Sequence, residues 1–310
     1  MSRIPVVLSL NSNYIIPALT AMKSVLDTVS DKNRIEFVIL HSALDSQTIA
    51  ILEKIVTHHG GSISFLNMTH IFMAHGQNPP DKMEMLASIL IPVHFTDHRY
   101  VFWLDADTLM KDDILSLTGA MPPDKKIGAV RCLFRNYLHN QNPTSPLYQE
   151  TALVEVESIC DYFNAGLILF NMRAISSEDG RRCLQLISRN WPGYGESILN
   201  HVFQHSLHFF SLRWNFPMMI IAESPALFNP TIRDDLQTSR SHIKMCHFLG
   251  PSKPWSKHHA GWFRDNLYPT TFTEHRNDYR KVCQAIMQDI ALVAPPIICG
   301  PSWNIMTSSH

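Results

Sequence analysis

The chain has 310 residues, of which 45% are hydrophobic, and this is enough for a large core in one or two domains. Its 26 basic and 27 acidic residues give a formal net charge of -1. This balance provides no overall basic field that would attract nucleic acid, so we expect no nucleic-acid partner. No apolar run approaches the roughly 18 residues that a membrane span needs, and we therefore expect a cytoplasmic protein.

The first apolar run and the cysteines agree with that expectation. The run ends at Leu10, because the polar segment 11–13 follows it, and it predicts a first strand rather than a signal peptide. Neither a CxxC pair nor a zinc-binding spacing occurs, which indicates ordinary thiols in a reducing compartment. The six cysteines are Cys132, Cys160, Cys183, Cys246, Cys283 and Cys299.

Strand-like and helix-like segments alternate along the chain, a pattern that favours an α/β fold with a largely parallel central sheet flanked by helices. Pro92 should kink or shorten the third helix. The polar loop 140–146 is expected to be a mobile or acceptor-facing element near the site. Strands are predicted at 5–10, 35–40, 62–66, 100–104 and 127–132, and helices at 17–29, 47–58 and 83–95.

The most informative segment is 101–107, an apolar run that stops at Asp105 and Asp107. Residues i and i+2 of an extended segment share a face, so both carboxylates can reach one cation. In open α/β sheets ligands bind beyond the carboxyl ends of the strands, where this pair would lie. Short DxD patterns also occur by chance, and a polar strand end is the structural alternative.

A second segment, 247–255, supplies complementary chemistry. His247 can complete a mixed oxygen and nitrogen shell, which suits Mn²⁺ better than Mg²⁺. Gly250 allows the backbone to approach a ligand closely, and Lys253 can place a point charge on a phosphate. Taken singly, a strand histidine, a turn glycine and a surface lysine need no special role. Together with the two aspartates they predict a metal and diphosphate site.

With these segments the sequence resembles glycosyltransferase family 8, the group that includes glycogenin and bacterial lipooligosaccharide α-galactosyl- and α-glucosyltransferases. The resemblance runs through residues 4–262 and implies the GT-A type of nucleotide-diphospho-sugar transferase fold. The segments that carry it, in the order of the family, are 9–14, 21–25, 104–107, 162–171, 198–200, 214–216 and 247–255.

The resemblance also implies roles for individual residues. Mn²⁺, with Mg²⁺ as the alternative, would be held by Asp105, Asp107 and His247. Asn11 and Tyr14 would hold the uracil ring of a UDP-sugar, and Gly250 and Lys253 would contact its diphosphate. The full set of expected donor-binding residues is Ser9, Asn11, Tyr14, Asp105, Ala106, Asp107, Gly250 and Lys253, and the expected catalytic residues are Glu196, Lys253 and Asn164.

The sequence departs from the family where the donor sugar would bind. Gly195 and Glu196 stand where the family has aspartate and glutamine, Ser88 stands in place of an arginine, and Cys132 lies near the place of another aspartate. Asn11 replaces the usual aspartate at the uracil. The smaller Ser88 and Gly195 would free volume for a 2-acetamido or other larger sugar. Two roles remain open for Glu196: a carboxylate that caps or pairs at a helix start, or a catalytic group at the β face of the sugar.

The implied function is a retaining transferase that moves a hexose from UDP-glucose or UDP-galactose to a glycan or glycolipid acceptor. The expected products are bacterial-type surface glycans such as lipopolysaccharide, lipooligosaccharide or capsule. A UDP-N-acetylhexosamine transferase is one alternative, and a UDP-sugar-binding protein without turnover is another. The complete set of metal and diphosphate residues argues against the second, because a non-catalyst has less need to stabilise a leaving group.

The expected domain organisation is a transferase domain at 1–260 and a helical, aromatic extension at 261–310. Bacterial relatives often carry a basic, aromatic tail that rests on the membrane. The apolar tail 297–303 has no dense lysine or arginine cluster, so its attraction to anionic lipid should be weak. We therefore expect core packing, with at most a weak peripheral contact with the inner membrane. The apolar residues that recur on one helical face of the extension are Val282, Ile286, Ile290 and Val293.

Overall fold

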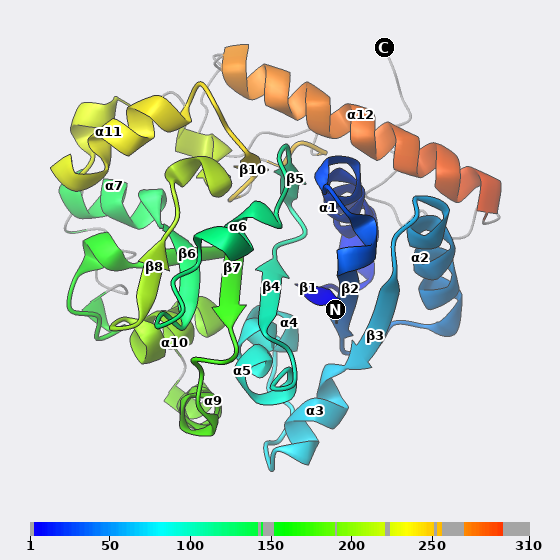
Figure 1. Ribbon diagram of the computed structural model, residues 1–310, viewed down its shortest axis with the longest axis horizontal. Coiled ribbons are helices and arrows are strands. Elements are labelled where there is room, and N and C mark those ends of the chain that lie inside the picture. Colours follow the sequence, from blue (N-terminus) through cyan, green and yellow to red (C-terminus); the bar gives the residue numbers. More distant parts are fainter. Residues whose placement is uncertain are drawn as a thin grey trace.

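The computed structural model describes residues 3–141, 144, 152–189, 191–220, 224–250, 253–255 and 270–293. They form an α/β fold in which a seven-stranded sheet lies between layers of helices (Figure 1). The spatial order is β3-β2-β1-β4-β7-β6-β8, and only β7 runs against the other strands. The expected fold class, a largely parallel sheet flanked by helices, is confirmed.

The strands are short, and most of their residues are buried. The large sheet consists of β1 (Ile4–Ser9), β2 (Ile35–His41), β3 (Ile63–Asn67), β4 (Tyr100–Leu104), β6 (Ile127–Arg131), β7 (Phe163–Asn171) and β8 (Leu207–Phe209). A separate three-stranded sheet consists of β5 (Thr108–Met110), β10 (Met245–His247) and β9 (Phe216–Pro217).

The helices differ widely in length, and α12 is by far the longest. The α-helices are α1 (Ile15–Thr28), α2 (Ser46–His58), α3 (Met68–Ala74), α4 (Met83–Leu86), α5 (Ile91–His94), α6 (Ser116–Ala120), α7 (Leu133–Gln141), α9 (Ser177–Gln185), α10 (Tyr194–Phe203), α11 (Pro230–Ser239) and α12 (Thr270–Val293). The 3-10 helices are η1 (Ser12–Tyr14), η2 (Lys32–Arg34), η3 (Ala87–Leu90), η4 (Ile159–Asp161), η5 (Leu186–Arg189), η6 (Leu212–Trp214), η7 (Met218–Ile220) and η8 (Pro225–Leu227).

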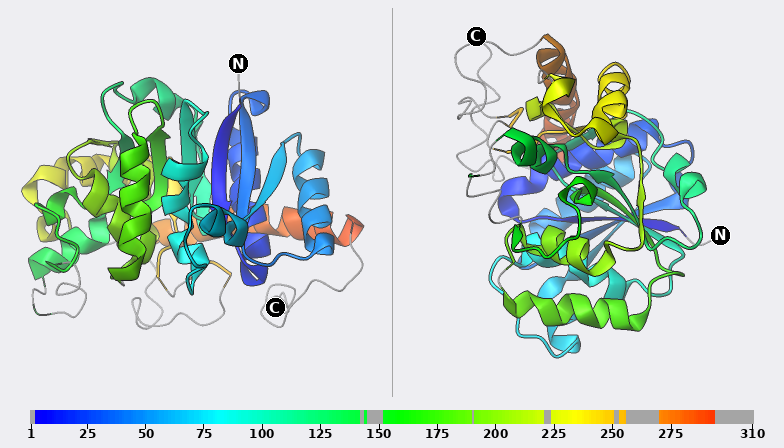
Figure 2. Two further views of the ribbon diagram at one scale, coloured as in Figure 1. Left: turned by 90° about the horizontal axis from the view of Figure 1, so that it is seen from below. Right: turned by 90° about the vertical axis from the view of Figure 1, so that its left-hand side faces the viewer.

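Two hydrophobic cores lie on the two faces of the large sheet. Figure 2 shows the helices that cover these faces. Successive side chains of a strand point to opposite faces, so Val6 and Leu8 of β1 enter one core and Val7 enters the other. The first core is covered by α1, α2 and α12, and the second by α3, α5, α9 and α10. Because β1 and β4 are covered on both faces, their sequences are continuous apolar runs.

The predicted helix at 83–95 is divided into α4, η3 and α5. Pro92 lies in the first turn of α5, where the missing N–H has no intrahelical partner to lose. The expected shortening is therefore confirmed, and the break precedes the proline. The other predicted strands and helices agree with the structure within two residues at each end. The expected loop at 140–146 begins inside α7 and for the most part lies outside the described residues.

The carboxyl-terminal helix packs on the rest of the fold. Helix α12 lies across α1 and α2 (Figure 1), and its buried residues include Phe272, Tyr279 and Ile286. His59, just after α2, is 2.7 Å from the carboxylate of Asp289 on α12. The tail 297–303 lies outside the described residues. No helix in the described part of the chain is both long and apolar enough to cross a bilayer.

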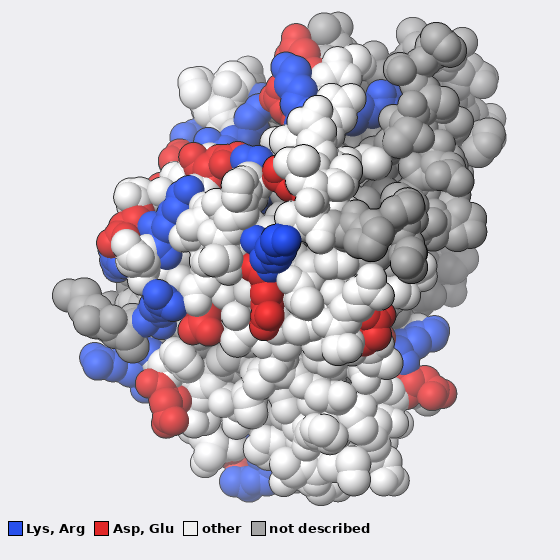
Figure 3. Space-filling model, turned by 90° about the vertical axis from the view of Figure 1, so that its right-hand side faces the viewer, with Lys and Arg blue, Asp and Glu red and all other residues white. Residues whose placement is uncertain are grey.

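Charged side chains and cysteines are distributed as follows. On the face drawn in Figure 3, basic and acidic side chains are interspersed, and neither sign covers it. All five cysteines within the described ranges are free thiols, and Cys299 lies outside them.

Candidate active site

Two carboxylates follow the central strand β4, as the sequence predicts. Asp105 and Asp107 lie between β4 and β5, and all residues of β4 are buried. The backbone N–H of Asp105 donates to the carbonyl of Gly166 at 3.0 Å, which attaches this turn to β7. The carboxylates are therefore held at the edge where β1, β2 and β4 end, which is the ligand-binding edge of open α/β sheets.

The small sheet brings a distant histidine to these carboxylates. Strand β10 pairs with both β5 and β9. His247, the last residue of β10, lies opposite Thr108, which directly follows Asp107. The N–H of Phe248 donates to the carbonyl of Asp107 at 3.0 Å. Residues far apart in the chain are thus joined by backbone pairing and not by side chains alone.

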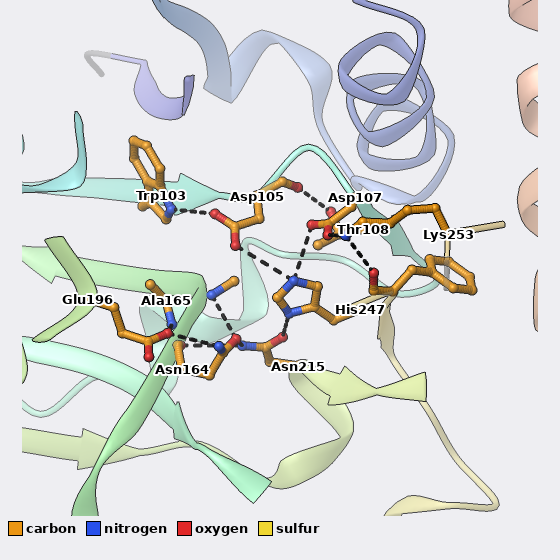
Figure 4. A network of polar contacts seen from close by, with 12 residues as sticks. Trp103, Asp105, Asp107, Thr108, Asn164, Ala165, Glu196, Asn215, His247 and Lys253 are labelled. Atoms are coloured by element: carbon orange, nitrogen blue, oxygen red, sulfur yellow. Dashed lines mark hydrogen bonds and ion pairs between the residues drawn. The ribbon is translucent and has the colours of Figure 1, made fainter. Parts of the chain in front are cut away.

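Asp105, Asp107 and His247 form a group that can hold a metal ion (Figure 4). Their candidate ligand atoms all lie within 4.8 Å of one another. Nε2 of His247 is 3.2 Å from an oxygen of Asp107 and 3.6 Å from an oxygen of Asp105. The His247 side chain is fully buried, whereas that of Asp105 is 33% exposed, so a ligand can approach from the Asp105 side.

A chain of hydrogen bonds fixes the orientation of His247 (Figure 4). It begins at Glu196, whose Oε2 accepts from Nδ2 of Asn164 and from the N–H of Ala165, each at 2.9 Å. A carboxylate can only accept, so the Asn164 amide turns its Oδ1 the other way, where it accepts from Nδ2 of Asn215 at 2.9 Å. Oδ1 of Asn215 then lies 2.8 Å from Nδ1 of His247.

The consequence is a defined tautomer of His247. Nδ1 carries the proton and donates to Asn215, so the lone pair of Nε2 points toward Asp105 and Asp107. Nε2 has no hydrogen-bond donor among the described residues. A lone pair that faces two carboxylates is repelled unless a positive charge lies between them. A divalent cation supplies this charge, and the oxygen and nitrogen donors present fit Mn²⁺.

Lys253 places a second positive charge beside this group. Its Nζ donates to Oδ2 of Asp107 and, at 2.9 Å, to the carbonyl of Phe248. Burial works against the charge of Asp107, but the ammonium of Lys253 opposes it, and the pKa of Asp107 lies below its usual range. Asp105 has no such lysine, and burial raises its pKa to about 6. The two carboxylates of one motif thus differ in their affinity for protons.

Gly166 allows the His247 ring to pack against β7. A Cβ at this position would overlap Cε1 and Nδ1 of the imidazole and would lie 2.8 Å from Oδ1 of Asn215. The pairing of β6 with β7 is also irregular near this level. Such bulges re-aim side chains beside active sites. The strand is therefore adapted to receive the histidine.

The segment after β10 has features expected of a diphosphate-contacting loop. Gly250 has a φ of +77°, a backbone region that favours glycine. The ring of Trp255 meets that of Tyr14 edge-on, with centroids 6.1 Å apart. On α12, Arg280 donates from Nε to the carbonyl of Pro254 at 3.1 Å. The loop that carries Lys253 therefore lies between α12 and the end of η1, where uracil contacts are expected.

The other expected donor-binding residues lie close to the ends of β1 and β4. Oγ of Ser9 is buried and has no hydrogen-bond partner among the described residues. Oδ1 of Asn11 already accepts from the N–H of Asn13 at 3.0 Å, and it has one further lone pair for a base. Ala106 is buried between the two aspartates.

The free volume expected beside Ser88 and Gly195 is absent. A Cβ at Gly195 would lie 2.9 Å from Oγ of Ser88 and 2.9 Å from the carbonyl oxygen of Met85. The glycine therefore lets α10 pack directly against α4 and η3. Cys132 is buried, and burial raises the pKa of its thiol to about 12, so it stays neutral and cannot replace a carboxylate. The expectation of a larger sugar pocket at these positions was wrong.

The Glycosyl transferase family 8 model matches residues 5–259 of the chain. The chain belongs to this family. No curated protein matches the sequence significantly.

Several solved glycosyltransferase structures share the fold of this chain. The bifunctional glycosyltransferase WbbM is 19% identical with a TM-score of 0.74, and the match covers 93% of this chain and 52% of WbbM. The chain thus spans about half the length of WbbM. The galactosyltransferase LgtC, in complex with donor and acceptor sugar analogues, is 20% identical with a TM-score of 0.68 over 94% of this chain and 98% of LgtC. GlyE from Streptococcus pneumoniae TIGR4 is 18% identical with a TM-score of 0.62, and the match covers 94% of this chain and 64% of GlyE. The expected GT-A fold is confirmed.

The site formed by Asp105, Asp107, His247 and Lys253 is called the family 8 site below. Four further residues contribute to it that the sequence did not predict. Asn215 holds His247, Gly166 makes room for its ring, and Trp103 donates from Nε1 to Oδ1 of Asp105 at 2.9 Å. Arg135 lies with its Nε 3.8 Å from Oε1 of Glu196. Three of the four lie within or beside the segments that carry the family resemblance, but nothing in their spacing shows which side chain each one contacts.

Asn215→Ala should weaken Mn²⁺ binding by about tenfold to a hundredfold, because the hydrogen bond that fixes the ring of His247 is lost. Asn215→Asp keeps an acceptor for Nδ1 but loses the donor to Asn164, so we expect it to bind Mn²⁺ better than the alanine variant. Calorimetric titration with Mn²⁺ alone measures both. Equal, unchanged affinities would show that Asn215 does not orient the histidine.

Proposed function

We propose that this protein is a retaining, metal-dependent transferase that moves a hexose from a UDP-sugar to a glycan or glycolipid acceptor. The proposed donors are UDP-glucose and UDP-galactose, and the proposed pathway is bacterial-type surface polysaccharide synthesis. The observation that carries the proposal is the lone pair of His247 held between two carboxylates with Lys253 beside them. Membership in family 8 supports glycosyl transfer as the reaction class.

Asp105, Asp107 and His247 would hold Mn²⁺, with Mg²⁺ as the alternative, and the ion would act as a Lewis acid on the diphosphate leaving group. Negative charge grows on the diphosphate as the bond to the anomeric carbon breaks. Lys253 is placed to stabilise that charge, because its Nζ already lies at the carboxylate of Asp107. Gly250 would let the backbone approach the phosphates.

Asn164 and Glu196 act in this proposal as positioning residues. Their hydrogen bonds to one another lead through Asn215 to His247. Oε2 of Glu196 already accepts two hydrogen bonds, and Oε1 faces Arg135. Of the two roles that the sequence leaves open for Glu196, these contacts favour the structural one. Ser9, Asn11 and Tyr14 remain the proposed contacts of the uridine.

The choice of donor rests on the similar structures and not on the shape of a sugar pocket in this chain. LgtC, a galactosyltransferase, has the same fold. The contact between Gly195 and Ser88 removes the reason to favour a 2-acetamido sugar. UDP-galactose and UDP-glucose are therefore the first donors to test.

The test is a donor screen with the full chain. Melting temperature and donor hydrolysis are measured with UDP-glucose, UDP-galactose and their N-acetyl forms, each with Mn²⁺ and with a chelator. We expect a Mn²⁺-dependent rise in melting temperature and slow hydrolysis for one of the two hexoses, since a ligand that binds the folded state stabilises it. Stabilisation without hydrolysis or transfer would identify a binding protein instead. No response to any donor would reject the proposed function.

A further inference from the structure

A hollow of about 440 Å³ lies at the edge of the large sheet opposite the family 8 site. Tyr100 lines it, and Tyr100 is the first residue of β4, whereas Asp105 follows the last. At about 3.3 Å per residue the length of β4 separates the two sites by roughly 13 Å or more. Its lining residues are Arg3, Ile4, Arg34, Arg99, Tyr100, Thr118, Gly119 and Arg173.

The topology of the sheet gathers the four arginines. Arg3, Arg34 and Arg99 directly precede β1, β2 and β4, which run parallel, so all three lie at the edge where these strands begin. Arg173 follows β7, which is antiparallel to β4 and therefore ends at the same edge. The amino terminus lies at this edge (Figure 2). Four separate segments thus place a guanidinium around one hollow.

These four charges are not neutralised by neighbours. Arg3 donates to Oγ of Ser62 at 2.7 Å, and Arg99 lies over the ring of Tyr100 with its Cζ 5.0 Å from the centroid. Within the described residues no carboxylate forms an ion pair with any of the four. Three other surface arginines do have such partners: Arg131 pairs with Asp161, Arg181 with Glu178 and Arg189 with Glu155.

Three carboxylates lie on or beside the same elements, and in the described part of the chain none of them pairs with the four arginines. Asp31 precedes Arg34 but uses a carboxylate oxygen as the cap of η2, where it accepts from the N–H of Asn33 at 3.0 Å. Glu36 lies one residue inside β2, and Asp97 precedes Arg99; neither forms an ion pair within the described part of the chain. The four guanidinium groups line the hollow, whereas none of these three carboxylates does.

We propose that this hollow binds a phosphate-bearing ligand, with a diphosphate group held by the four arginines. Guanidinium groups bind phosphate oxygens in bidentate pairs, and four of them match the charge of a diphosphate. The volume falls within the roughly 300–1,000 Å³ of small-molecule sites and is larger than a single inorganic ion needs. The ligand is either a free phosphorylated molecule or the headgroup of an anionic phospholipid.

Gly119 offers a direct test because it lies in the wall of the hollow. A Cβ at this position would meet no other atom within 4 Å, so a side chain there can be accommodated. Gly119→Asp places a negative charge among the arginines, and Gly119→Ala is the uncharged control of the same backbone. Binding of pyrophosphate to the full chain is measured by calorimetry at low salt with a chelator, which removes metal-dependent binding at the family 8 site.

We expect pyrophosphate to bind the parent chain and Gly119→Ala, and to bind Gly119→Asp about tenfold or more weakly, the scale of one lost charged hydrogen bond. Arg34→Gln should weaken binding similarly, and Lys253→Ala should not. Donor hydrolysis should be the same in Gly119→Asp and the parent. A parallel measurement with vesicles of phosphatidylcholine, with and without phosphatidylglycerol, distinguishes the sources. Vesicle binding that Gly119→Asp removes identifies a headgroup, and pyrophosphate binding without vesicle binding identifies a soluble ligand.

Three results would overturn the inference. The parent chain could bind neither pyrophosphate nor the anionic vesicles. Gly119→Asp and Arg34→Gln could bind as well as the parent while their melting temperatures are unchanged. Lys253→Ala could lose the affinity while Gly119→Asp keeps it, which would place the anion in the family 8 site.

Discussion

Asp107→Ala should abolish Mn²⁺-dependent binding of UDP. The substitution removes one of three candidate ligands and also the carboxylate that pairs with Lys253. The fold should survive with some loss of stability, because Lys253 loses this carboxylate but keeps its bond to the carbonyl of Phe248.

Calorimetric titration with UDP, with Mn²⁺ and with a chelator, measures this effect. Asp112→Ala is a matched control, since Asp112 is an exposed carboxylate paired with Lys244. Such a pair contributes about 1 kcal/mol or less to stability and should not affect UDP binding. Unchanged metal-dependent affinity in Asp107→Ala would mean that the two aspartates and the histidine do not form the metal site.

The parts of this site that depend on local patterns could be predicted from the sequence. The strand before Asp105 is a continuous apolar run because both of its faces are covered, and such runs are recognised without knowledge of the partners. His247 was found through its family segment. Its approach to Asp107 depends on a three-stranded sheet whose strands have two or three residues, too few to show a periodicity.

Contacts between side chains from distant segments could not be predicted. Asn215 and Glu196 are joined through Asn164, and no spacing in the sequence indicates that these three residues meet. Residue size was also misleading at Gly195. A small residue leaves a hollow only if the neighbouring elements do not pack closer to it. Here α10 packs against Ser88, so no hollow remains. The four arginines of the opposite edge meet only because of strand order, which no spacing in the sequence indicates.

Glu196 connects the stability of the protein with the geometry of its metal site. Its side chain is 18% exposed, and its neighbour Arg135 is 7% exposed. Arg135 also lies over the ring of Tyr162, with its Cζ 4.4 Å from the centroid. The carboxylate thus faces a largely buried cation on one side and the amide of Asn164 on the other. Removal of the carboxylate takes one contact from each neighbour, while Arg135 keeps Tyr162 and Asn164 keeps Asn215.

Glu196→Ala should therefore lower the free energy of unfolding by about 3 kcal/mol, since it removes three contacts, with Arg135, Asn164 and the N–H of Ala165, at about 1 kcal/mol each. It should also weaken Mn²⁺ binding, because Asn164 is freed to turn and Asn215 no longer has a fixed partner. Denaturant unfolding gives the first quantity and calorimetric titration with Mn²⁺ the second.

Glu196→Gln separates positioning from chemistry. The amide oxygen of glutamine can accept from both Asn164 and Ala165, so the orientation of His247 should be kept. The charge that faces Arg135 is lost, and we expect about 1 kcal/mol less stability from that pair. Mn²⁺ affinity and turnover should stay within about tenfold of the parent. A loss of turnover of more than about a hundredfold with unchanged Mn²⁺ affinity would show instead that the carboxylate takes part in the reaction, since that is the scale of a positioned acid-base or charged group.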